Sequence, residues 1–253
     1  MNIIEVKDLM VTYGAVHALQ HTNVSIPLGS RTAVLGPNGA GKSTLIKAIL
    51  GIERIAEGQI TLFNEYTPNH PDVQQKIAYV PQASQVNTQF PTTIFDIVLM
   101  GRFTYTKGLL RRPSKEDKQF ALAALEKMGL ADLKNRHITE LSGGQKQRVF
   151  IARAIAQNAE LYIMDEPLAS VDIRTEQIIM DTLKEFQEQG KTSLVIHHDL
   201  HTVTKYFDYV VWLNQTAIAQ GPRDVAFTQE VYQQAYQQSG TSFMDISSGK
   251  GAN

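Results

Sequence analysis

A glycine-rich loop that ends in lysine and serine constrains this chain more than any other feature of its sequence. The loop matches the pattern G-x-x-x-x-G-K-S/T and consists of Gly36, Pro37, Asn38, Gly39, Ala40, Gly41, Lys42, Ser43 and Thr44. It directly follows a short apolar run, Thr32 to Leu35, and leads into an apolar helical stretch, Leu45 to Leu50. A strand, a tight loop and a helix in this order place backbone N–H groups and a helix N-terminus around phosphate oxygens. We therefore expect a nucleoside triphosphate site in which Lys42 reaches the β and γ phosphates and Ser43 ligates Mg²⁺.

Two adjacent carboxylates follow a second apolar run, Leu161 to Met164. Two acids at a strand end are usually part of a solvated turn, but downstream of a phosphate loop they suit magnesium and water activation. Asp165 is expected to meet Mg²⁺ through water, and Glu166 to polarise the attacking water.

A second possible anion site lies at Ser142, 23 positions ahead of Asp165. Its motif consists of Ser142, Gly143, Gly144 and Gln145, and it opens an apolar-rich helical stretch, Val149 to Ala156. An N-capped surface helix would use the same residue types. Because one nucleotide needs only one phosphate loop, we expect this motif to close over the nucleotide held by another copy of the chain.

Short apolar runs alternate with helical stretches along the rest of the sequence. The helix expected over Arg174 to Gln189 carries Ile179, Leu183 and Phe186 on one face. This alternation predicts an α/β fold with a largely parallel sheet that helices cover on both faces. The buried strands are expected at Thr32–Leu35, Ile77–Val80, Leu161–Met164, Ser193–Ile196 and Val210–Leu213.

Two regions depart from this alternation. The N-terminal part is expected to form antiparallel strands at Ile3–Val6, Asn23–Ile26 and Gln59–Phe63. Residues from about 83 to 156 lack an obvious strand and are read as a helical insertion. In it, Ser114 and Asp117 form a capping box for a helix that stops near Gly129. Residues 241–253 are rich in Ser and Gly and are expected to form a flexible tail.

Composition excludes several classes of protein. The chain has 24 basic and 25 acidic residues, so its net charge of -1 gives no general attraction to nucleic acid. It has no cysteine, which excludes disulfides and thiolate chemistry. Its apolar runs are far shorter than the roughly 20 residues of a membrane-spanning helix, and Met1 to Leu9 does not have the character of a signal peptide. We expect a soluble protein of the cytoplasm.

With these motifs, the sequence resembles the ATP-binding cassette family from about Ile3 to Tyr236. The resemblance implies that Tyr13 stacks on adenine, and that Gln82 touches Mg²⁺ and relays to the helical insertion. It implies further that His198 contacts the γ-phosphate, that Glu166 is the catalytic base and that Asp172 crosses a dimer interface. His197 and His201, four residues apart, could alternatively suggest a metal site, but the family pattern already employs His198.

The resemblance also implies an architecture and a working state. The fold would be a RecA-like P-loop NTPase core with a small antiparallel β part and an inserted helical subdomain. One nucleotide-binding domain would span residues 1–240, with the core at about 1–82 and 157–240 and the helical subdomain at about 83–156. ATP and Mg²⁺ would be the ligands, and two copies would sandwich two ATP molecules. Lys42, Gln82, Glu166 and His198 would be the catalytic set.

A finer resemblance is to the importer branch that serves manganese, zinc or iron. It rests on five segments: Gln89 to Arg102, Arg148 to Ala154, His197 to Leu200, Tyr206 to Asp208, and Gly221 with Pro222. The implied partners are membrane permease subunits, one of whose helices contacts Phe90 to Arg102, and, indirectly, an extracytoplasmic metal-binding protein. The chain would then lie at the cytoplasmic face of the membrane. An importer of siderophore, haem or cobalamin, an efflux ATPase and a soluble non-transport cassette protein remain alternatives.

Overall fold

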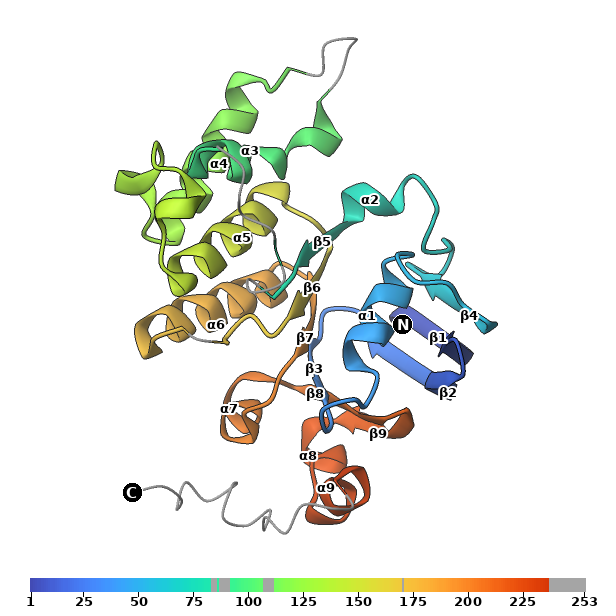
Figure 1. Cartoon of the computed structure of the whole chain (residues 1–253). Coiled ribbons are helices and arrows are strands. Elements are labelled where there is room, and N and C mark those ends of the chain that lie inside the picture. Colours follow the sequence, from blue (N-terminus) through green and yellow to red (C-terminus); the bar gives the residue numbers. More distant parts are fainter. Residues whose placement is uncertain (83–85, 87–91, 107–111, 170, 237–253) are drawn as a thin grey trace. The chain divides into compact units, whose positions relative to one another are not determined.

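The computed structural model describes residues 1–82, 86, 92–106, 112–169 and 171–236 (Figure 1). The chain forms two compact units: unit 1 comprises Met1–Val73 and Phe186–Asn253, and unit 2 comprises Gln74–Glu185. The tail expected at 241–253 lies outside the described residues, as do residues 89–91 at the start of the importer-type stretch. The subdomain boundaries near residues 83 and 156 stay a prediction.

Unit 1 contains a three-stranded antiparallel sheet of β1 (Asn2–Tyr13), β2 (Val16–Pro27) and β4 (Glu57–Leu62), in the order β2-β1-β4. The antiparallel strands expected near the N-terminus are therefore present, although β1 and β2 are much longer than the expected runs. A two-residue turn at Gly14, which has φ +61°, joins them and lets the pairing extend to Tyr13 and Val16.

The second sheet of unit 1 positions the phosphate loop. It has the order β7-β3-β8-β9, in which β3 pairs in parallel with both of its neighbours and β9 is antiparallel to β8. The strands are β7 (Thr192–Ile196), β3 (Arg31–Leu35), β8 (Tyr209–Asn214) and β9 (Thr216–Pro222). The helices of this unit are α1 (Lys42–Ile49), α7 (Leu200–Tyr206), α8 (Arg223–Ala226) and α9 (Gln229–Ala235). The apolar runs expected as buried strands here are confirmed.

Unit 2 contains two parallel strands and a group of helices. β5 (Ile77–Val80) follows α2 (Val73–Lys76) and pairs with β6 (Leu161–Asp165). Figure 1 shows α3 (Ile94–Met100), α4 (Lys115–Lys127) and α5 (Gly143–Gln157) packed together, and α6 (Ile173–Glu188) follows β6 in the chain. The described part of this unit also contains the 3₁₀ turns η2 (Phe103–Tyr105), η3 (Ala131–Leu133) and η4 (Ile138–Glu140). No strand interrupts those residues of the expected helical insertion that the structure describes.

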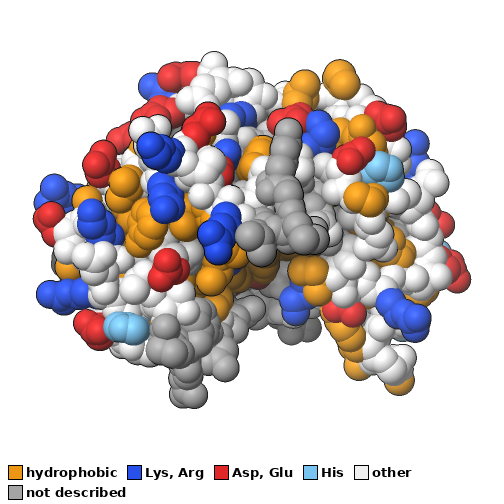
Figure 2. All heavy atoms as spheres, turned by 90° about the horizontal axis from the view of Figure 1, so that it is seen from above, with side chains coloured by type: hydrophobic (Ala, Val, Ile, Leu, Met, Phe, Trp, Pro, Cys, Tyr) orange, Lys and Arg blue, Asp and Glu red, His pale blue; other side chains and the backbone are white. Residues whose placement is uncertain are grey.

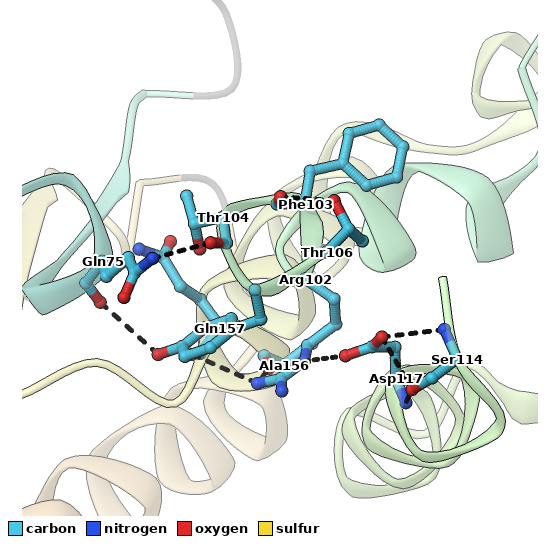
Figure 3. Close-up of polar contacts among 10 residues, drawn as sticks. Gln75, Arg102, Phe103, Thr104, Thr106, Ser114, Asp117, Ala156 and Gln157 are labelled. Atoms are coloured by element: carbon cyan, nitrogen blue, oxygen red, sulfur yellow. Dashed lines mark hydrogen bonds and ion pairs between the residues drawn. The ribbon is translucent and has the colours of Figure 1, made fainter. Parts of the chain in front are cut away.

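A buried ion pair joins three segments of unit 2 (Figure 3). Arg102 Nε donates to Asp117 Oδ1 at 3.0 Å, and the two side chains are only 8% and 9% exposed. Arg102 Nη1 also donates to the carbonyl oxygen of Ala156 at 3.0 Å. The guanidinium lies 4.1 Å from the ring centroid of Tyr105 and 4.3 Å from that of Phe120. Arg102 thus connects the end of α3 with the start of α4 and the end of α5.

The capping box expected at Ser114 and Asp117 is confirmed and shares its carboxylate with this ion pair. Asp117 Oδ2 accepts from the Ser114 amide at 2.9 Å and from the Ser114 hydroxyl at 2.8 Å. Burial raises the pKa of Asp117, but the hydrogen bonds from Ser114 and the charge of Arg102 outweigh it, so the pKa lies below its ordinary value.

The surface mixes charges of both signs, as the net charge of -1 leads one to expect. On the face drawn in Figure 2, Lys and Arg side chains alternate with Asp and Glu side chains, and hydrophobic side chains lie between them. Within the part of the chain that the structure describes, no helix combines the length and apolar character needed to cross a membrane.

Candidate functional site

The phosphate loop lies between β3 and α1 and depends on glycine at three positions. Gly36, Gly39 and Gly41 have φ of +146°, +80° and +89°, which residues with a side chain rarely adopt. Space is restricted as well, because a Cβ at Gly36 would clash with the carbonyl oxygen of Leu213. A Cβ at Gly41 would lie 2.6 Å from the carbonyl oxygen of Ala18. The loop is therefore held against the strands around it, and Gly41 is the N-cap of α1.

The Lys42 side chain extends across this loop. Its Nζ donates to the carbonyl oxygens of Gly36 at 2.7 Å and Pro37 at 2.8 Å, and the residue is only 6% exposed. Ser43 and Thr44 follow in the first turn of α1. The strand, loop and helix expected from the sequence are thus present, and the Lys42 ammonium group is bonded to two carbonyl oxygens of the loop.

The Tyr13 ring at the end of β1 is linked to α1. Its hydroxyl donates to Glu53 Oε2 at 2.7 Å, and Glu53 is itself placed by its amide, which donates to the carbonyl of Lys47 at 3.2 Å. Burial and then Glu53 raise the pKa of Tyr13, whereas a hydrogen bond from the Thr44 side chain lowers it. The ring remains 44% exposed. Sequence reasoning missed Glu53, since nothing local indicates that a residue 40 positions away meets Tyr13.

The two histidines after β7 have different environments. His198 is exposed, whereas His197 is 5% exposed and hydrogen-bonds through Nε2 to the Thr202 hydroxyl. Burial lowers the pKa of His197 to about 4, with Asp199 opposing and His198 reinforcing the shift. His197 is therefore neutral at pH 7. Among the described residues, no three His, Cys, Asp or Glu side chains are grouped so that they could hold a metal ion.

In unit 2, the carboxyl ends of β5 and β6 bring Gln82 and Glu166 together. Val80 and Met164 are partners in the parallel register, so the residues that follow them lie side by side. Gln82 Nε2 donates to Glu166 Oε2 at 2.9 Å. Glu166 has φ +49°, a left-handed conformation that a non-glycine residue adopts at a cost of about 1–3 kcal/mol.

Asp165, the last residue of β6, is only 2% exposed. Its charge reaches the neighbouring strand, where burial and Asp165 together raise the pKa of Tyr79 to about 12, against the opposing charge of Arg153. The end of β6 thus holds two carboxylates in different settings: Asp165 is buried at the strand end, and Glu166 is hydrogen-bonded to Gln82.

The motif at Ser142 begins α5, as expected. Ser142 Oγ accepts from the Gln145 amide at 3.3 Å, and Gln145 Oε1 accepts from the Ser142 amide at 3.0 Å, which forms a capping box. Gly143 and Gly144 form the first turn, and a Cβ at Gly143 would meet no neighbouring atom within 4 Å. The start of this 15-residue helix therefore presents backbone N–H groups on an open surface.

Asp172 serves as a cap for α6. Its Oδ1 accepts from the Thr175 amide at 2.7 Å, and this hydrogen bond is the main reason that the pKa of Asp172 is lowered. Burial opposes the shift slightly, and the Thr175 side chain and Arg148 add to it. The neighbouring Ile173 is 86% exposed. Sequence reasoning assigned Asp172 to an interface and did not foresee its capping role.

These features define a P-loop protein that binds nucleoside triphosphate: a parallel sheet with a glycine loop and lysine in one unit, and strand-end carboxylates in the other. A family model described as ABC transporter matches residues 19–169. The chain therefore belongs to the ABC transporter family, and it is an ATPase of that family.

Two curated relatives match almost the whole chain. The manganese transport system ATP-binding protein MntB of Bacillus subtilis (strain 168) is 47% identical over 233 residues, 92% of each chain. The zinc transport system ATP-binding protein TroB of Treponema pallidum (strain Nichols) is 48% identical over 92% of this chain and 86% of its own length.

Solved structures agree on the fold. An ATP-binding cassette of an ABC transporter in its ADP conformation has a TM-score of 0.78 and 28% identity, covering 94% of this chain and all of that one. A dimeric cassette in a post-hydrolysis state, bound to ADP and phosphate, has a TM-score of 0.77 and 28% identity over 87% of this chain and 98% of its own. The α/β class with a mostly parallel sheet and a small antiparallel β part is confirmed.

Proposed function

We propose that this chain is the ATP-hydrolysing subunit of an importer that takes up a transition metal (manganese, zinc or iron) through separate membrane subunits. The observation that carries the proposal is the similarity, over 92% of the chain, to ATP-binding proteins of manganese and zinc transport systems. ATP hydrolysis acts as a switch in this reading, since the γ-phosphate bridges two copies of the chain and its loss releases them.

Binding of ATP begins at the phosphate loop. Backbone amides of the loop and of the first turn of α1 hold the phosphates, and Tyr13 stacks on the adenine. The Lys42 ammonium, now bonded to the carbonyls of Gly36 and Pro37, moves to β and γ phosphate oxygens, where charge-assisted hydrogen bonds are stronger. The remaining loop residues that we assign to ATP are Asn38, Gly39, Ala40, Gly41, Ser43 and Thr44.

The residues assigned to Mg²⁺ suit that ion. Ser43 would supply a hydroxyl oxygen, Gln82 an amide oxygen and Asp165, through water, a carboxylate. Mg²⁺ prefers oxygen ligands of this kind and keeps several waters, so the donor set fits it. When bound, the ion would neutralise charge on the β and γ phosphates.

Glu166 is the base in this proposal. Its carboxylate takes a proton from the attacking water, and the amide of Gln82, 2.9 Å away, orients the carboxylate for this transfer. His198 contacts the γ-phosphate. The exposed position of His198 after β7 and the closeness of Gln82 to Glu166 support these roles.

The second half of each ATP site comes from a second copy of the chain. Ser142, Gly143, Gly144 and Gln145 contact the γ-phosphate in trans, and Asp172 lies at the interface between the copies. The open N-terminus of α5 and the 86% exposure of Ile173, beside Asp172, support a surface that another copy covers. The dimeric solved structure with a TM-score of 0.77 supports the same arrangement.

A permease subunit docks on the region of α3 and η2, which contains the described part of the segment expected to contact it. Met100 and Phe103 are 41% and 49% exposed. Figure 3 shows the Phe103 ring pointing away from the buried pair of Arg102 and Asp117. Large apolar side chains that are this exposed and close together in the chain favour a protein partner. The chain then lies at the cytoplasmic face of the membrane, and an extracytoplasmic protein captures the metal.

The ATPase assignment is tested with Glu166→Gln in the purified full-length chain. We expect turnover to fall by roughly 10²-fold or more while ATP is still bound, because the amide cannot accept the proton. Glu160→Gln is a matched control, since Glu160 precedes β6 at its other end and pairs with Lys76 on the surface. Normal turnover in Glu166→Gln would refute the assignment of the base.

The metal assignment is tested in a strain that lacks the chain. Cellular manganese, zinc and iron are measured under scarcity, with complementation by the unaltered chain or by Glu166→Gln. Loss of one metal, restored only by the active chain, would support the importer and name its cargo. Unchanged metal contents, with ATPase activity intact in the purified chain, would refute metal import and leave the ATPase standing.

A further inference from the structure

Strand β5 leads directly to Gln82, and its two sides bind different partners. The carbonyl of Lys76, just before the strand, accepts from the Glu160 amide beside β6 at 3.0 Å. Carbonyls alternate in direction along a strand, so those of Ile77 and Tyr79 point away from β6. Of the strands that the structure describes, β6 alone pairs with β5.

Two side chains of α5 bind those outward carbonyls. Gln157 Nε2 donates to the carbonyl of Ile77 at 2.7 Å, and Arg153 Nη2 donates to the carbonyl of Tyr79 at 3.1 Å. The donors are four residues apart on a helix and therefore lie on one face. The acceptors are two residues apart on a strand and therefore share one edge. Helix α5 is thus attached to β5 at two successive points.

A second contact at Arg153 involves α3. The carbonyl oxygen of Arg153 lies so close to Gly101, the C-cap of α3, that a Cβ at Gly101 would clash with it. Arg153 therefore contacts α3 through its backbone and β5 through its side chain. Burial also lowers the pKa of Arg153, so the charge is kept inside unit 2 at a free-energy cost that an apolar side chain would avoid.

We propose that Arg153 and Gln157 are positioning residues that couple α5 and α3 to the hydrogen bond between Gln82 and Glu166. The inference rests on the proposed function, in which α5 begins with the trans-acting Ser142 and α3 faces the permease. Binding of ATP in trans at Ser142, or docking of the permease at α3, would shift α5. The two hydrogen bonds would then displace β5 along its own axis. Gln82, two residues beyond the strand, then changes its position relative to Glu166.

The test is a double-mutant cycle on the turnover number of the purified full-length chain. Arg153→Met should lower kcat roughly tenfold and leave the affinity for a fluorescent ATP analogue within about twofold, since the phosphate loop belongs to unit 1. In a Gln82→Ala background, the same change should alter kcat less than twofold, because the group that Arg153 positions has gone. Arg153→Lys should recover part of the loss, as it keeps a cationic donor.

Arg148→Met is the matched control. Arg148 lies on the same helix and also donates to a backbone carbonyl, that of Met128 at 3.1 Å, which follows α4 and does not belong to β5. Arg148→Met should change kcat by the same factor in the unaltered chain and in the Gln82→Ala background. Thermal melting of every variant identifies any that fail to fold, and Gln157→Met then replaces Arg153→Met in the cycle.

The inference would be overturned if Arg153→Met lowered kcat by the same factor in both backgrounds. It would also be overturned if Arg153→Met left kcat of the otherwise unaltered chain unchanged. The proposed function is tested separately, by the turnover numbers of Gln82→Ala and Glu166→Gln. If both of those turn over normally, the site assignment is wrong. If both are impaired and the Arg153 factor does not depend on Gln82, only the positioning role is wrong.

Discussion

Replacing Asp117 by alanine should destabilise the protein far more than an ordinary substitution near the surface. Both oxygens of this carboxylate are used: Oδ1 accepts from Arg102, and Oδ2 accepts from the amide and the hydroxyl of Ser114. The change therefore removes the partner of a buried cation and half of the capping box of α4 at once.

The magnitude follows from these two losses. Removing one member of a buried ion pair costs about 3–5 kcal/mol, because the other charge stays buried without its partner. The lower end applies here, since Arg102 keeps its bond to the Ala156 carbonyl and lies between the rings of Tyr105 and Phe120. Loss of the cap adds about 1 kcal/mol. The free energy of unfolding should thus fall by about 4 kcal/mol.

The assay is urea unfolding followed by circular dichroism, with the double variant Arg102→Met/Asp117→Ala as comparison. Because the double variant buries no unpaired charge, it should be more stable than Asp117→Ala alone by about 1–2 kcal/mol. Methionine suits the space between the two aromatic rings. A loss below about 1 kcal/mol for Asp117→Ala, or a double variant less stable than the single one, would refute the reasoning.

Three further predictions concern unit 1. Gly36→Ala should abolish measurable ATP binding in a nucleotide titration, because its Cβ meets the Leu213 carbonyl and φ is +146°; unchanged affinity would contradict the packing of the loop. Glu53→Ala should raise KM for ATP by about 2–5-fold with kcat unchanged, since it removes the hydrogen bond that holds the Tyr13 ring. Steady-state kinetics test this, and a change in kcat alone would contradict it. Because the pKa of His197 is about 4 in the fold and about 6.5 in the unfolded chain, the unfolded chain takes up the proton first, and stability should fall as pH drops from about 6.5 to 4. The loss, about 3 kcal/mol at most, should be much smaller in His197→Gln, as urea unfolding at both ends of this range would show.

The parts of the site that could be predicted from the sequence are those with local signals. The phosphate loop, the start of α5 and the capping box at Ser114 each depend on residues a few positions apart. The adjacency of Gln82 and Glu166 has no local signal, because it arises only when two apolar runs 84 positions apart pair as parallel neighbours.

The remaining features depend on contacts between distant residues. Glu53 meets Tyr13, and Gln157 meets Ile77, only after the chain has folded, and no pattern near either residue marks it. Strand β9 was missed for another reason: most of its side chains are half-buried, so the sequence shows neither a continuous apolar run nor a regular alternation.

The two hydrogen bonds from α5 to β5 also bear on solubility. An edge strand with open carbonyls can accept a strand from another molecule and begin aggregation. Here the Ile77 and Tyr79 carbonyls are already occupied by Gln157 and Arg153, so an incoming strand would have to displace a side-chain amide and a half-buried guanidinium. In the folded chain, helix α5 thereby protects this edge of β5 against intermolecular β-pairing.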